Sequence, residues 1–168
     1  NKTTYATAAF KTTRLINGHT IENVGKGVMD VKISHRFGKI NGGAYELFGL
    51  DNASMRMGLD YGITRYLMVG IGRSTFQKTL DAFFKLKILR QSSGKRNMPI
   101  TLSYVPTIAY KTLKDENPDR KNYFSSKLIY THQLIIGRKF SEATSLQLMP
   151  TVTHVNLVQL QTDPNDLV

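Results

Sequence analysis

The sequence predicts an all-β protein, an antiparallel up-and-down transmembrane β-barrel with about eight strands in this chain, forming one domain over residues 1–168. Two observations favour this fold. Apolar and polar residues alternate with a period of two over long segments, which is typical of strands whose two faces meet different surroundings. Several of these segments exceed the about 5–6 residues usual in globular proteins and match the about 9–11 residues of a tilted transmembrane strand.

The composition is compatible with such a barrel. The mean hydropathy is −0.27, a value that averages lipid-facing apolar and lumen-facing polar side chains. The hydrophobic fraction of 40 % is too high for a disordered chain. No apolar run is long enough for a transmembrane helix. The chain has no cysteine, which excludes a disulfide scaffold, a thiolate metal site and a cysteine nucleophile.

The strands follow one another along the chain, and the clearest is 52–62, where apolar residues occupy every second position. The weakest is 4–16, with Ala6, Ala8 and Phe10 on one face. In order, the predicted strands are 4–16, 27–37, 52–62, 65–74, 77–91, 98–111, 123–138 and 144–158. From the second strand onward their apolar faces are Met29, Val31, Ile33 and Phe37; Met55, Met57, Leu59, Tyr61 and Ile63; Leu67, Val69 and Ile71; Leu80, Ala82, Phe84, Leu86 and Ile88; Ile100, Leu102, Tyr104 and Ile108; Leu128, Tyr130, Leu134 and Ile136; and Leu146, Leu148 and Val152.

The connections sort onto two sides of the predicted barrel. Turns on one side are expected near 62–66, 92–97 and 139–143, and the connections on the other side are 38–51, 74–77 and 111–122. Barrels of this kind have short periplasmic turns and longer extracellular loops, which fits the long, charged 111–122 segment. The stretch 42–50 is expected to form a helical turn at the membrane interface.

Two features of the sequence fit a closed set of strands poorly. Pro106 and Pro150 lie inside predicted strands, where each removes a donor from the ladder, so we expect bulges or interfacial positions there. Residues 163–168 have the composition of a loop. Either eight strands close and leave a frayed tail, or the full protein continues beyond residue 168, and we favour continuation.

Three runs of sequence resemble an uncharacterised family of Bacteroidota outer-membrane β-barrel proteins, a domain of unknown function. They are VMDVKISHRFGKINGGAYELFGLDNASMRMGLDYGITRYLMVGIGRST, KILRQSSGKRNMPITL and NYFSSKLIYTHQLIIGRKFSEATSLQLMPTVTHVNLV. The resemblance covers roughly residues 4–166. It implies an outer-membrane location in a diderm bacterium and members that extend past the point where this chain stops. It carries over no catalytic or ligand residue.

Positive charge is the most informative feature of the composition, with 23 Lys and Arg against 12 Asp and Glu and a net charge of +11. Sorted by strand phase, the candidate basic lumen contains Lys32, Arg36, Arg56, Lys85, Lys87, Lys111 and Lys127, opposed by Asp30, Asp60 and Asp81. A narrow barrel is filled by its own side chains, which favours an internal network of ion pairs. The excess of cations keeps a second interpretation open, an anion-attracting lumen whose partners are ligands or lipid head groups.

A high isoelectric point of 9.9 also raises the question of nucleic acid. Nucleic-acid-binding barrels interleave Lys and Arg with exposed aromatic residues on which bases stack. Here the lysines alternate with Leu, Ile and Phe, as in the 80–88 stretch. We therefore expect no nucleic-acid partner. Tyr and Phe residues near the predicted strand ends fit the aromatic girdles of a membrane barrel instead.

No cofactor or metal site is expected, because the sequence has neither a spaced ligand cluster nor a phosphate-binding glycine loop. We expect a non-enzymatic outer-membrane barrel, a structural or accessory component of an outer-membrane assembly, with membrane lipids and other outer-membrane proteins as partners. One alternative is a small anion or solute pathway across the membrane. Another is a lipid- or peptide-directed hydrolase or acyltransferase, in which His132 would act with Ser126 or Thr131.

Overall fold

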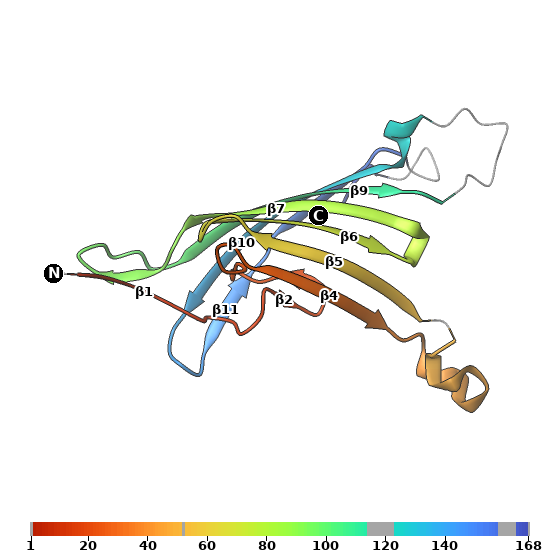
Figure 1. Ribbon diagram of the computed structural model, residues 1–168, viewed down its shortest axis with the longest axis horizontal. Coiled ribbons are helices and arrows are strands. Elements are labelled where there is room, and N and C mark those ends of the chain that lie inside the picture. The colour runs from red at the N-terminus through yellow and green to blue at the C-terminus, as the bar shows by residue number, and fades with distance from the viewer. Residues whose placement is uncertain (1, 52, 114–122, 158–163, 168) are drawn as a thin grey trace.

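The computed structural model describes residues 2–51, 53–113, 123–157 and 164–167. Its main element is a nine-stranded antiparallel sheet in which strands that follow one another along the chain lie side by side (Figure 1). These strands are β4 (Met29–Arg36), β5 (Ser54–Gly62), β6 (Leu67–Ser74), β7 (Thr79–Leu89), β9 (Thr101–Lys111), β10 (Leu128–Lys139), β11 (Ser145–Leu148), β12 (Thr151–Val155) and β13 (Asp166–Leu167). Each range predicted as a strand from residue 27 onward contains β-structure, although the strand predicted at 123–138 begins only at Leu128 and 144–158 contains two short strands, and the fold is all-β.

The sheet is an arch, with β7 near its crown and β4 and β11 on its two flanks (Figure 1). In the described part of the chain it does not close into a barrel, since β4 at one edge pairs only with β5 and β13 at the other only with β12. The right-handed twist of adjacent strands produces this curvature. The arch therefore has a convex outer face and a concave inner face.

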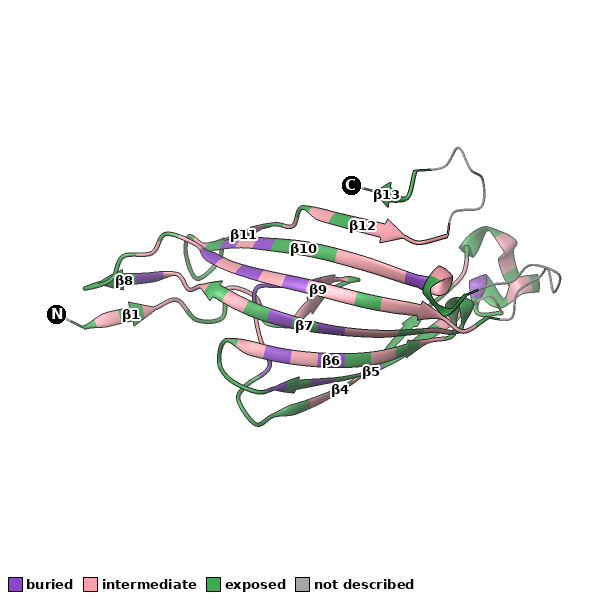
Figure 2. Cartoon of the chain, turned by 90° about the horizontal axis from the view of Figure 1, so that it is seen from above, coloured by how far each residue is buried: buried purple, intermediate pink, exposed green. Residues whose placement is uncertain are grey.

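The alternation predicted from the sequence is confirmed, because exposed positions alternate along the strands with buried or half-buried ones (Figure 2), and most of the exposed positions carry apolar side chains. On β7, Phe84 and Leu86 are exposed while Phe83 and Lys85 are buried. The other exposed apolar side chains of the outer face include Met29, Val31, Ile33, Met57, Leu59, Ile71, Leu80, Ile88, Ile108, Leu134, Leu146, Leu148 and Val152. A water-soluble sheet buries its aliphatic side chains and exposes its charged ones. This sheet has the opposite distribution, with a buried lysine on the inner face and exposed aliphatic side chains on the outer face.

The first predicted strand, 4–16, is wrong. β1 (Thr3–Tyr5) pairs with β8 (Ser92–Gly94) beyond the end of the sheet, and β2 (Arg14–Leu15) and β3 (Gly18–His19) pair only with each other. Ala8 and Ile16 adopt positive φ angles of 51° and 53°, which interrupt an extended chain. Residues 6–26, here called the inner segment, run along the concave face instead of joining the wall, whereas Gly27 and Val28 already pair with Gly62 at the end of β5.

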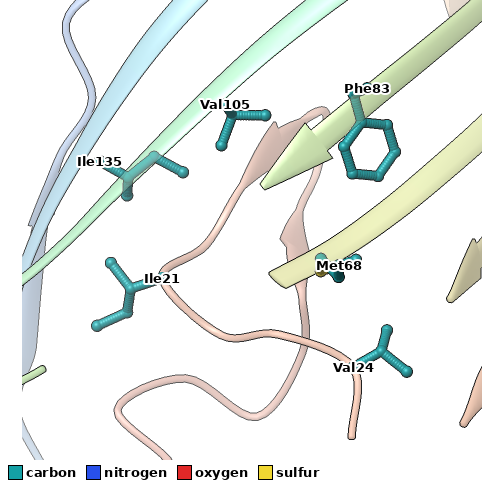
Figure 3. Close-up of a cluster of buried hydrophobic side chains, with 6 residues drawn as sticks. All are labelled: Ile21, Val24, Met68, Phe83, Val105 and Ile135. Carbon is teal, nitrogen blue, oxygen red and sulfur yellow. The ribbon is translucent and has the colours of Figure 1, made fainter. Parts of the chain in front are cut away.

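The small hydrophobic core lies between the inner segment and the concave face (Figure 3). It consists of Ile21 and Val24 from the inner segment and Met68, Phe83, Val105 and Ile135 from β6, β7, β9 and β10. Gly137 makes room for this contact, since a Cβ atom there would lie 2.7 Å from Cδ1 of Ile21. Burial of these apolar side chains attaches the inner segment to the sheet.

The two prolines interrupt ladders without shifting them, which corrects the expectation of bulges. Pro106 pairs with His132 in unbroken register, and the ladder to β7 lapses opposite it, between Phe83 and Leu86, and resumes in the same register. The register shift of this ladder lies further along, between Lys87 and Leu89. Pro150 separates β11 from β12, yet both keep the same register with β10. A proline lacks the N–H donor but does not require an extra residue, so the predicted strand 144–158 becomes two short strands in line.

The connections lie on the two sides that the sequence predicts, as an antiparallel order requires. The 3₁₀ elements η1 (Ile40–Gly49), η2 (Phe76–Lys78) and η3 (Phe124–Lys127) lie at one end, and η1 confirms the expected helical turn. Most of the predicted 111–122 loop lies outside the described residues. The terminal stretch expected to be a loop contains β13, whose backbone pairs with the free edge of β12. No helix in the described ranges is long and apolar enough to cross a membrane.

Candidate functional site

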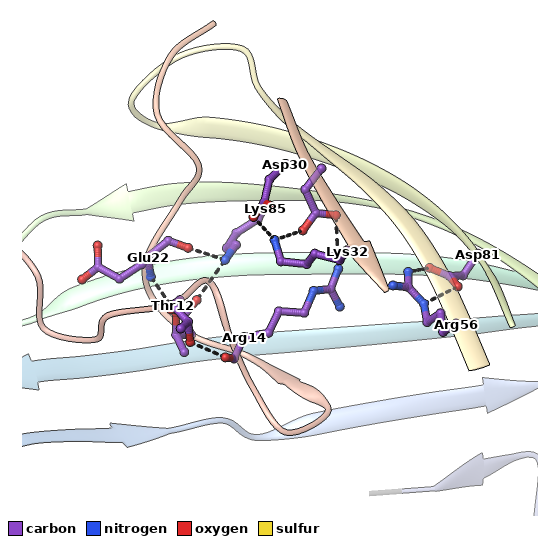
Figure 4. A network of polar contacts seen from close by, with 10 residues as sticks. Thr12, Arg14, Glu22, Asp30, Lys32, Arg56, Asp81 and Lys85 are labelled. Atoms are coloured by element: carbon purple, nitrogen blue, oxygen red, sulfur yellow. Dashed lines mark hydrogen bonds and ion pairs between the residues drawn. The ribbon is translucent and has the colours of Figure 1, made fainter. Parts of the chain in front are cut away.

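The candidate site is the polar network on the concave face, where charged side chains from the sheet meet the inner segment (Figure 4). Asp60 of β5 is its centre and is 1 % exposed. Its carboxylate accepts from Nζ of Lys32 on β4 at 3.0 Å and from Nη2 of Arg14 on the inner segment at 3.5 Å. Lys32 also pairs with Asp30. One buried carboxylate thus joins a cation of the sheet to a cation of the inner segment.

A second ion pair lies further along the concave face, between Arg56 of β5 and Asp81 of β7. Nε of Arg56 donates to Oδ1 of Asp81 at 3.0 Å, and Nη2 donates to Oδ2, so the pair is bidentate. The guanidinium lies over Gly58 and Gly72, which are paired in register. A Cβ atom on Gly72 would come 2.2 Å from Nη2 of Arg56, so the two glycines create the space that this pair occupies.

Lys85 of β7 is fully buried and donates to backbone carbonyls rather than to a carboxylate. Its Nζ lies 3.0 Å from the oxygen of Thr20 and 2.5 Å from that of Glu22. In the described part of the chain no carboxylate lies within 4.0 Å of this ammonium. A buried charge is costly unless it is hydrogen-bonded, so the two carbonyls fix the inner segment against the crown of the sheet.

Further contacts fix the same stretch of the inner segment. Gln147 of β11 donates from Nε2 to the oxygen of His19 at 2.8 Å and accepts from N of Ile21 at 3.0 Å. The ring of His19 meets the edge of Phe83 at 4.5 Å. Burial, followed by the positive charge of Arg14, lowers the pKa of His19 from 6.5 to about 2. The imidazole is therefore neutral in the folded protein near pH 7.

The up-and-down antiparallel sheet thus has an aliphatic outer face and a charged inner face that the inner segment covers. The chain matches, over residues 10–168, the family described as Membrane bound beta barrel domain (DUF5777). The chain belongs to this family. It is a membrane-bound domain of unknown function, so membership indicates a membrane location and assigns no activity. No curated protein and no solved structure matches the chain significantly.

For this member of the family, the seven residues of the candidate basic lumen are distributed over three places. Lys32, Arg56, Lys85 and Lys87 lie on the concave face. Arg36 is exposed at the end of β4, where it lines, with Arg14 and Arg56, a hollow of about 410 Å³. Lys111 ends β9, and Lys127 of η3 donates to the oxygen of Leu113 at 3.1 Å. The predicted internal network therefore includes Lys32, Arg56 and Lys85, each of which has a partner on the concave face.

Sequence reasoning missed the contacts by which Arg14, His19 and Gln147 connect the inner segment to the sheet. Arg14 was assigned to a wall strand by the weak alternation of 4–16, and His19 lies in the connection that follows it. The available signal was that same weakness, together with charged and apolar residues that follow no period of two over 10–28. Gln147 was placed correctly on the polar face of its strand.

The histidine pairs considered for catalysis are not brought together. His132 faces outward and its Nδ1 lies 2.7 Å from the hydroxyl of Tyr104. Thr131 faces inward and contacts Thr153, and Ser126 lies in η3 beyond the end of β10. Among the described residues no group of three or more His, Cys, Asp or Glu could hold a metal ion. The geometry therefore brings the side chain of neither Ser126 nor Thr131 next to the imidazole of His132.

Proposed function

We propose that this domain is an outer-membrane β-barrel of a diderm bacterium whose interior is occupied by its own inner segment. In this proposal it serves as a structural or accessory component of an outer-membrane assembly and is not an enzyme. The observation that carries the proposal is the buried ammonium of Lys85, held by the carbonyls of Thr20 and Glu22. An open pore would leave that ammonium in water, whereas an occupied interior gives it two acceptors.

The outer face supports contact with membrane lipids. An apolar groove of about 640 Å³ lies on it, between the strands β4 to β9. It is lined by side chains including Val31, Met57, Leu59, Ile71, Leu80 and Ile108. Lipid chains can fill such an apolar groove without depriving any polar group of a hydrogen bond. The sheet edges at β4 and β13, each with one neighbour in the described residues, support pairing with further strands or with other outer-membrane proteins.

The proposal is tested on the full protein purified from outer membranes. Expected results are extraction only with detergent, a heat-dependent shift in gel mobility, and no steady conductance when the protein is inserted into planar bilayers. Proteins that co-purify from native membranes would identify the assembly. Recovery as a soluble monomer without detergent contradicts the membrane location, and steady conductance of the unaltered protein contradicts an occupied interior.

A second candidate, a small anion or solute pathway, is favoured by the hollow that Arg14, Arg36 and Arg56 line at one end of the concave face. Such a pathway needs the inner segment to move. It predicts anion-selective current steps that disappear on the charge reversal Arg36→Glu. Arg36 is suited to this test because it is exposed and makes no ion pair with a described residue.

A further inference from the structure

A separate hollow of about 460 Å³ lies between the inner segment and the end of the sheet where the short turns are. Four cations line it, Lys26 of the inner segment, Arg65 of the turn after β5, Lys87 of β7 and Arg90 just beyond β7. The one carboxylate among its lining residues is Glu22. We call this hollow the basic pocket. Four cations against one carboxylate leave a local excess of three positive charges.

Within the described part of the chain, none of the four cations of the basic pocket forms an ion pair, and the nearby charge of Glu22 acts on Lys87 without direct contact. No carboxylate of the described residues lies within 4.0 Å of Lys26, Arg65, Lys87 or Arg90, in contrast to Arg14, Lys32 and Arg56 of the polar network. Arg90 stacks on the ring of Tyr5 at 4.5 Å, a contact that leaves its N–H donors available.

The neighbouring polar side chains, Glu22 and Asn23, also leave the pocket short of hydrogen-bond acceptors. Glu22 is already engaged, since its Oε1 accepts from the backbone nitrogens of Ala9 and Phe10 at 2.9 and 3.4 Å. Asn23, which also lines the pocket, has both side-chain atoms buried and without a hydrogen-bond partner in the described structure. A buried amide without a partner is costly and rare in folded proteins. An anion in the pocket would accept from the amide nitrogen and from the cations together.

We propose that the basic pocket binds a phosphate-bearing anion. Guanidinium groups form bidentate hydrogen bonds with phosphate, and ammonium groups add point charge. The pocket offers both kinds of donor from elements distant in sequence, so its geometry depends on the inner segment being docked. The pocket would recognise the phosphate of a lipid head group and a free phosphate solute by the same chemistry. The two sources are therefore distinguished by experiment.

The experiment uses the full protein in a non-ionic detergent and measures binding by titration calorimetry. Inorganic phosphate is the first probe, and a short-chain phosphatidylglycerol below its micelle concentration is the second. Binding of inorganic phosphate indicates a free anion, and binding of the lipid alone indicates a head group. If neither probe binds at millimolar concentration, the proposal is wrong.

Variants locate the binding. Lys87→Gln and Arg65→Gln each remove one donor, so we expect about a tenfold loss of affinity for the probe that binds, the equivalent of one charge-assisted hydrogen bond. Arg65 lies in an exposed turn, so its variant keeps the test valid if Lys87→Gln does not fold. Asn23→Ala should weaken binding with no change of charge. Lys95→Gln, which directly follows β8 and does not line the pocket, is the matched control. An equal loss with this control would show non-specific attraction and overturn the assignment.

Discussion

Nζ of Lys85 lies 3.0 Å from the carbonyl oxygen of Thr20, and this hydrogen bond joins the crown of the sheet to a segment 65 residues earlier in the chain. Lys85 and Thr20 are both fully buried. The same ammonium also holds the carbonyl of Glu22. Water does not reach the ammonium of Lys85, so its hydrogen-bond acceptors must come from the protein itself. The carbonyl oxygens of the inner segment are these acceptors.

Lys85→Met tests the importance of this contact. Methionine nearly keeps the volume but removes the donor, so the carbonyls of Thr20 and Glu22 lose their partner. We expect docking of the inner segment to weaken by about 1.5–3 kcal/mol, the range for a hydrogen bond to a charged group. Hydrogen–deuterium exchange of the amides at residues 18–24 measures this directly. Lys87→Met is the matched comparison, because Lys87 has the same phase on β7 and interacts with Glu22 of the inner segment by charge rather than by a hydrogen bond, so its effect should be smaller. Equal effects of the two variants would contradict the prediction.

Asp60→Asn is expected to be the most damaging change in the polar network. It leaves Arg14 and Lys32 without the buried carboxylate that they share, and removal of one member of a buried pair costs about 3–5 kcal/mol. The midpoint of the heat-dependent shift in gel mobility reports the loss. Asp30→Asn removes a carboxylate whose side chain is 43 % exposed, and an exposed pair contributes less than about 1 kcal/mol. The prediction is contradicted if the two variants lower the midpoint equally.

Gly137→Ala is expected to disturb the inner segment through sterics alone. The added Cβ would come 2.7 Å from Cδ1 of Ile21, closer than atoms approach, so the inner segment must shift. Overpacking of this kind costs about 1–3 kcal/mol. Combination with Ile21→Ala removes the clashing atoms, so the double variant should be more stable than the sum of the two single effects. Simple additivity in this double-mutant cycle would show that the two residues do not meet.

Docking of the inner segment should weaken as the pH falls below about 6.5. The pKa of His19 is lowered to about 2 in the folded protein. A released, solvated histidine takes up a proton near pH 6.5 while the docked one does not, so acid favours release and the loss grows as pH falls toward 2. The charged groups that face His19 are Arg14 of the inner segment, Lys32 of β4, Arg56 of β5 and Lys85 of β7, and all four oppose its protonation.

The measurement for this prediction is hydrogen exchange of the inner segment between pH 7 and 5, corrected for the intrinsic pH dependence of exchange. Carboxylates titrate mostly below that range, so His19 dominates. His19→Gln should abolish the dependence. His132→Gln, which alters an exposed histidine on the outer face, should leave it intact. A dependence that survives in His19→Gln would assign it to another group.

Most of the sheet could be predicted from the sequence because two residues in succession on a strand meet opposite surroundings. Phe83 and Phe84 are chemically identical, yet alternation alone assigns Phe83 inward with Lys85 and Phe84 outward with Leu86, and the structure confirms it. Pro150 shows the limit of the method, since the sequence locates the interruption but not whether the ladder shifts.

The inner segment could not be predicted because period-two analysis assumes that every extended stretch belongs to the wall. Residues 4–16 contain enough alternation to satisfy that assumption weakly. What fixes the inner segment is contact across large distances in sequence, such as Gln147 with His19 and Ile21. Such contacts have no local periodicity. For the same reason the sequence identified the carboxylates of the network but not the cation, Arg14, that shares Asp60 with Lys32.

The glycine pair Gly58 and Gly72 makes the sheet unusually thin at one point. On the inner side the guanidinium of Arg56 lies directly on their backbone, and on the outer side the same two glycines line the apolar groove. Only a single layer of peptide groups separates the Arg56–Asp81 pair from that groove. The attraction between two charges strengthens as the surrounding dielectric constant falls. Under the proposed lipid contact, the acyl chains in the groove are therefore part of the dielectric environment of a charge pair on the opposite face of the sheet.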